Sequence, residues 1–128
     1  MPEYEVSGSV DASAEAVFGY LSDVDHLTDY VPGMVLAREE GDRLRVAADV
    51  QGRHEEGRAW LHADSDLRKL EWGGQGTAGY RGWLQVTGSG PGATVTIHLS
   101  TDRTSDAEEI RRSLSQALAN IKNQAAGS

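Results

Sequence analysis

Hydrophobic positions follow two different periods along this chain, and the changes of period divide it into elements. From Tyr4 to Val10, apolar or small residues alternate with polar ones, as is typical of a half-buried strand. Apolar residues then recur at helical spacing after Ser13, a good helix cap, and again before Pro32-Gly33, which ends a helix. This pattern predicts one strand followed by two short helices.

The alternation of apolar and polar residues that is typical of strands returns between Met34 and Thr101, where turn-forming residues interrupt it. Turn signals fall at 41–42, 51–52, 64–66, 73–76 and 88–92, and they delimit five or six further strands. After a capping box at Ser105–Glu108, one apolar stripe runs to about Gln124 and predicts a long amphipathic helix. The chain therefore predicts an α+β fold of one domain over residues 1–128, in which a curved antiparallel sheet of six or seven strands surrounds a long C-terminal helix.

Four segments carry a resemblance to a known family: VDASAEAVFGYLSD at 10–23, DHLTDYVPG at 25–33, LRKLEW at 67–72 and GATVT at 92–96. Together with the order of elements, they resemble the START-like (SRPBCC) superfamily of helix-grip proteins. Ser13 stands where many relatives have proline, and Phe18 stands where many have tryptophan. The resemblance covers nearly the whole chain. Within the superfamily, the chain is similar to the bacterial polyketide cyclase/dehydrase-like proteins. It implies a cavity between sheet and helix that holds a hydrophobic or amphipathic small molecule of lipid, polyketide or isoprenoid type.

The composition is compatible with such a half-hollow domain. Only 38% of the 128 residues are hydrophobic, and 15 are glycine. Gly8, Gly57, Gly79 and Gly82 lie inside predicted strands, where glycine suits the bends and bulges that curl a sheet.

Charge and residue inventory exclude several classes of function. The net charge is −8, and residues 1–42 contain one basic residue, Arg38, so a nucleic-acid partner is not expected. No apolar run is long enough to span a membrane and the N-terminus does not resemble a secretory signal, so we expect a cytoplasmic protein with no stable membrane insertion. Cysteine is absent, and the four histidines lack the spacing of a metal site. The pattern therefore predicts no metal and no cofactor.

The hairpin between Leu44 and Ala63 decides which side chains would face a cavity. A two-residue turn at Gln51-Gly52 pairs Val50 with Arg53 and places Ala59, Leu61 and Ala63 on the covered face. A three-residue loop, with glycine in its left-handed position, pairs Asp49 with Arg53 instead. We favour the three-residue loop, which turns inward His54, Glu56, Arg58, Trp60 and His62.

Strand parity supplies the other predicted lining residues. Leu70 and Trp72 share one face, as do Tyr80, Gly82, Leu84 and Val86, whereas Trp83 points outward, where it is either an isolated ring or a homodimer contact. The complete set of predicted ligand-binding residues is Glu56, Arg58, Trp60, Trp72, Tyr80, Leu84, Ile97, Leu114 and Leu118.

Three classes of function remain open on the sequence. We favour a binding or carrier module for a hydrophobic small molecule, because no recognisable catalytic constellation is present. A polyketide cyclase/dehydrase-type enzyme would use His54, Glu56, Arg58 or Tyr80 as acid, base or orienting groups. A protein-interaction module with a closed core is the third class.

Overall fold

The computed structural model describes residues 3–31, 34–41, 43–50, 53–74, 81–88, 91–100 and 107–125. Its elements follow the predicted order: β1 (Glu3–Val10), α1 (Ala14–Leu21), the 3-10 helix η1 (Val24–His26), α2 (Leu27–Tyr30), β2 (Met34–Glu40), β3 (Arg43–Val50), β4 (Arg53–Asp64), β5 (Lys69–Gly74), β6 (Arg81–Thr87), β7 (Ala93–Ser100) and α3 (Ala107–Ala125). The α+β helix-grip prediction is confirmed.

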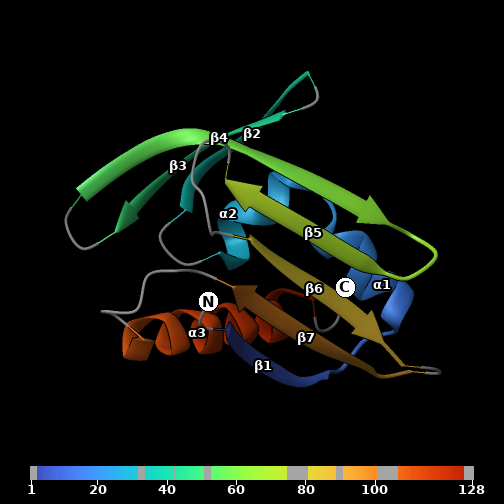
Figure 1. Ribbon diagram of the computed structural model, residues 1–128. Helices are drawn as coiled ribbons and strands as arrows, with labels where there is room; N and C mark the ends of the chain where they lie inside the picture. The colour runs from blue at the N-terminus through green and yellow to red at the C-terminus, as the bar shows by residue number, and fades with distance from the viewer. Residues whose placement is uncertain are drawn as a thin grey trace.

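The seven strands form one antiparallel sheet in the order β1-β7-β6-β5-β4-β3-β2. Figure 1 shows α3 beside β1 and β7, while β2, β3 and β4 form the opposite end of the sheet. The main neighbours of α3 among the described residues are β1, α2, α1 and β7. The helix therefore covers one end of the inner face much more closely than the other.

Local sequence explains where the helices begin and end. The Ser13 side chain accepts a hydrogen bond from the Ala16 backbone N–H at 3.2 Å and caps α1, and the Asp23 carboxylate does the same for η1 through Asp25 at 3.0 Å. The predicted N-cap of the last helix, Ser105, lies outside the described residues.

The first two residues of the turn predicted at 73–76 prove to be strand, and the other two lie outside the described residues. Gly73 and Gly74 belong to β5, where Gly73 pairs with Trp60 of β4. A Cβ on Gly73 would lie 2.5 Å from Nε1 of Trp60, so the glycine is needed for the close approach of the indole rather than for a reversal of the chain.

Candidate functional site

One row of residues crosses the inner face of the sheet in direct register. Leu61 pairs with Trp72, Trp72 with Gly82, Gly82 with Leu99, and Leu99 with Tyr4, so the row runs from β4 through β5, β6 and β7 to β1. Leu61, Trp72 and Leu99 are only half-buried, although they pack against the core. This row marks the boundary between the closed core and a more open part of the inner face.

The next row toward α1 is fully closed. Leu70, Leu84 and Ile97 pair in sequence across β5, β6 and β7, and they are 1%, 2% and 3% exposed. Leu114 and Leu118 of α3 are buried in the same cluster. Four of the predicted lining residues (Leu84, Ile97, Leu114 and Leu118) therefore lie in the packed core.

The open part of the inner face lies over β3 and β4. Val46 pairs with Gly57, and a Cβ built on Gly57 meets no described heavy atom within 4 Å. On β1, in contrast, a Cβ on Gly8 would lie 3.0 Å from Cδ2 of Leu118. Among the described residues, the space above the inner face is thus filled beneath α3 and open above Gly57.

We call the contiguous apolar surface at this end the inner-face patch. It comprises Val46, Gly57, Ala59, Leu61, Trp72 and Leu99. Among the described side chains of β3 to β7, none that faces inward is ionisable. The described part of this surface therefore suits an apolar molecule.

The register of the β3–β4 hairpin corrects the predicted lining of the cavity. Val50 pairs with Arg53, so the prediction of a three-residue loop is wrong, and Leu44 pairs with Ala59 on the inner face. Because a shift of one residue exchanges the two faces of a strand, Glu56, Arg58 and Trp60 lie on the outer face. His54 and His62 are exposed there as well, and Tyr80 lies outside the described residues.

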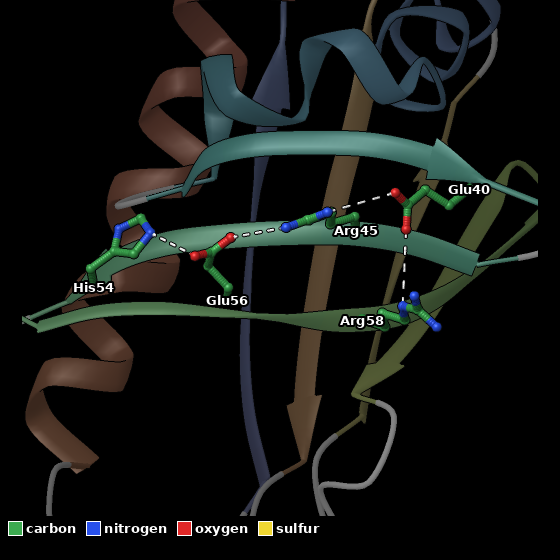
Figure 2. Close-up of polar contacts among 5 residues, drawn as sticks. All are labelled: Glu40, Arg45, His54, Glu56 and Arg58. Atoms are coloured by element: carbon green, nitrogen blue, oxygen red, sulfur yellow. Dashed lines mark ion pairs between the residues drawn. The ribbon is translucent and has the colours of Figure 1, made fainter.

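The ionisable residues of the hairpin form a ladder on the outer face (Figure 2). Glu56 lies between His54, 3.6 Å from its Nε2, and Arg45, 3.5 Å from its Nη2. Glu40 of β2 continues the ladder, 3.9 Å from both Arg45 and Arg58. These side chains are exposed to solvent and satisfy one another, so the ladder is a solvated surface rather than a pocket.

His54 is also bound to the neighbouring carboxylate on β3. Its Nδ1 lies 2.6 Å from Oδ1 of Asp49, and this hydrogen bond is the main cause that raises the pKa of His54 above its ordinary value of 6.5. Asp49 therefore pairs with His54, whereas the sequence predicted Arg53 as its partner.

Two tryptophans lie on the outer face, Trp60 and Trp83, the second as predicted. Trp83 stacks on His98 with ring centroids 5.2 Å apart, and Nζ of Lys69 lies 5.0 Å from the centre of the Trp83 ring. His98 in turn places its Nε2 3.0 Å from a carboxylate oxygen of Glu3. Trp83 is thus enclosed by neighbours from its own sheet.

The helices after β1 hold a second cluster of titratable groups. The Tyr20 hydroxyl donates to Asp29 at 3.2 Å and its ring stacks on His26, with centroids 4.1 Å apart. Burial and the charge of Asp29 raise the pKa of Tyr20, and burial raises the pKa of Tyr30, whose hydroxyl donates to the Leu21 carbonyl at 2.8 Å. These hydrogen bonds join α1 to α2, so the cluster has a structural role.

A groove of about 490 Å³ lies between η1 and β2, and its rim includes Asp23, Asp25, Arg38 and Glu39. Its carboxylates make it a poor site for an apolar molecule. The described residues contain no cluster of three or more potential metal ligands, and no described helix has the length and apolar character to cross a membrane. The inner-face patch is therefore the best-supported candidate site.

The sequence placed Trp72 and Val46 on the inner face but missed Gly57 and Leu61, for which a signal was present. The signal was the alternation in β4, where small or apolar residues at 57, 59, 61 and 63 oppose polar ones at 54, 56, 58 and 62. With the two-residue turn, that alternation would have placed all of them correctly.

Known proteins show the same architecture. The family model described as polyketide cyclase/dehydrase and lipid transport matches residues 1–126. Solved structures that resemble the chain include TTHA0849 of Thermus thermophilus, with 16% identity, a TM-score of 0.81 and 97% of each chain covered. The Zhui aromatase/cyclase of Streptomyces sp. R1128 has 16% identity and a TM-score of 0.82, with 97% of this chain and 93% of that chain covered.

A START superfamily protein of Mycobacterium smegmatis has 15% identity and a TM-score of 0.73, with 96% of each chain covered. At these identities the likeness establishes the fold. None of the curated proteins matches the sequence significantly.

Proposed function

The chain belongs to the polyketide cyclase/dehydrase and lipid transport family, and from this premise we propose that it binds a hydrophobic or amphipathic small molecule on the inner-face patch. The ligand would lie above Gly57 and against Leu61 and Trp72, with lipid-, polyketide- and isoprenoid-like molecules as the expected classes. This is the part of the inner face that α3 does not closely cover.

The observation that carries the proposal is the unfilled space over β4. No described atom lies within 4 Å of a Cβ on Gly57, while Val46, Leu61 and Trp72 nearby remain half-exposed. Complete burial of one aliphatic side chain yields about 1.5–3 kcal/mol, so several half-exposed side chains together supply a few kcal/mol of binding energy. A bound apolar molecule would complete a core that the protein's described side chains leave open.

The position of the described ionisable side chains favours binding over catalysis. A cyclase or dehydrase reaction needs groups that move protons next to the ligand. Three of the four predicted candidates for that role, His54, Glu56 and Arg58, lie on the other side of the sheet, where they pair with one another and with Glu40, Arg45 and Asp49. The fourth, Tyr80, lies outside the described residues. We therefore propose a carrier or binding role in which the protein encloses its ligand without transforming it.

Native mass spectrometry of the purified protein, compared with a denaturing measurement of the same sample, tests the proposal. We expect a species heavier than the apoprotein under native conditions and its loss on denaturation, with an apolar compound recovered by organic extraction. An apoprotein that also fails to bind added hydrophobic probes would overturn the binding proposal. Conversion of the recovered compound during incubation with fresh protein would establish the enzymatic alternative.

A further inference from the structure

Two tryptophan–glycine pairs lie next to each other on opposite faces of the sheet. Trp72 of β5 pairs with Gly82 of β6 on the inner face, and Trp60 of β4 pairs with Gly73 of β5 on the outer face. A Cβ on Gly82 would lie 2.7 Å from Cε2 and Cζ2 of Trp72. Each indole thus packs closely against a glycine, and the two pairs form a matched comparison between faces.

The Trp72 ring brings a single kind of polar group to the inner-face patch. Val46, Ala59, Leu61 and Leu99 present only hydrocarbon, whereas the indole carries an N–H donor at Nε1. Among the described residues, Nε1 of Trp72 has no hydrogen-bond partner. Nδ1 of His98 also lacks a partner and is fully buried, whereas Nε1 of Trp72 is not fully buried. The N–H therefore keeps some exposure to solvent, on a ring that belongs to the inner-face patch.

An apolar molecule that covers this ring separates the N–H from water. If the molecule has no acceptor, the donor loses its hydrogen bond to water and gains nothing in exchange. A carbonyl or hydroxyl oxygen at that point would restore the bond, while the rest of the molecule remains in contact with hydrocarbon. A buried donor of this kind discriminates strongly against ligands that lack the matching acceptor.

We propose that Trp72 selects, among hydrophobic ligands, those with a hydrogen-bond acceptor oxygen placed against its Nε1–H. Trp72 is then the specificity-determining residue of the patch, and the ligand class narrows from hydrocarbons to oxygenated apolar molecules such as ketones, phenols and enols. This inference rests on the proposed function, because it concerns how the same site chooses its ligand.

The test uses two probes of nearly equal shape, tetralin and 1-tetralone, which differ by one carbonyl group. Isothermal titration calorimetry gives the ratio of their dissociation constants for the wild-type protein, for Trp72→Phe and for the control Trp60→Phe. We expect Trp72→Phe to shift this ratio against 1-tetralone by about fivefold, the factor of one neutral hydrogen bond. Trp60→Phe should leave the ratio unchanged, because its indole lies on the outer face.

A measurement on the wild-type protein avoids dependence on the stability of the variants. The ¹H–¹⁵N spectrum contains one indole signal for each of the three tryptophans. We expect 1-tetralone to move the Trp72 signal downfield, tetralin to produce no comparable downfield shift, and the Trp60 and Trp83 signals to remain in place. Equal effects of the two probes, or an unchanged ratio in Trp72→Phe, would overturn the role of Trp72 and leave ligand binding intact. Failure of both probes to bind the wild type would overturn the proposed function itself.

Discussion

Adding one methyl group at Gly82 should destabilise the protein measurably. The new Cβ of Gly82→Ala would lie 2.7 Å from two carbons of the Trp72 indole and 2.9 Å from the His98 carbonyl oxygen. Carbon atoms in favourable contact are about 3.5–4.0 Å apart, so the indole must move by about 1 Å and the neighbouring strand must yield as well. Overpacking of this kind costs about 1–3 kcal/mol of unfolding free energy.

Gly57→Ala is the matched control on the same face of the sheet. Its methyl group meets no described atom within 4 Å, and alanine restricts the unfolded chain more than glycine does. We therefore expect Gly57→Ala to be neutral or to stabilise the protein by about 0.4–1 kcal/mol.

Thermal unfolding followed by circular dichroism, together with urea titration, measures both variants. For a domain of this size, 1 kcal/mol corresponds to about 3–5 °C in Tm, so Gly82→Ala should unfold about 3–15 °C below the wild type. Wild-type stability of Gly82→Ala, or an equal loss in Gly57→Ala, would refute the distinction between a filled and an open part of the inner face.

Three further predictions follow from the placement of individual side chains. Leu84→Ala should lose about 2–5 kcal/mol of stability, because this side chain is 2% exposed, whereas Leu61→Ala should lose less stability and weaken probe binding more. Arg58→Met should leave the affinity for 1-tetralone unchanged, since Arg58 lies on the outer face. His54→Gln should lower Tm at pH 5.5, below the unfolded-state pKa of about 6.5, and the difference should vanish as the pH rises through the higher folded-state pKa, where His54 loses its proton.

A different result would contradict each of these three predictions. Equal stability losses in the two leucine variants would show that Leu61 is core, and a weakened Arg58→Met complex would return Arg58 to the site. For His54, the control is His62→Gln, also exposed on β4. A Tm difference for His54→Gln that grows toward alkaline pH would contradict the His54–Asp49 interaction.

Strand parity was predictable wherever large apolar residues alternate with polar ones. Leu70 and Trp72, and likewise Gly82 and Leu84, were placed on the inner face and are found there, because only one assignment buries the large side chains. The order of helices was equally predictable from the caps and the change of period.

The β3–β4 hairpin could not be resolved in this way because both of its registers satisfy local chemistry. Asp49 gains a partner in each, Arg53 in the predicted loop and His54 in the structure. The three-residue loop was favoured for the position of its glycine and for the Asp49–Arg53 charge pair. Neither signal bears on Trp60, which lies on the outer face. Its ring is accommodated outside because Gly73 on the adjacent strand lets the indole lie against the backbone, a contact between segments that local sequence does not reveal.

The proposed ligand position is the space above Gly57 on the inner face. A phenylalanine at this position would fill the space from the sheet itself, and Glu56→Phe places the same ring one residue away on the opposite face. Calorimetric titration with 1-tetralone should show affinity reduced about tenfold or more in Gly57→Phe, a loss of about 1.4 kcal/mol, and nearly unchanged in Glu56→Phe. Wild-type affinity in Gly57→Phe, or an equal loss in both variants, would contradict the proposed position.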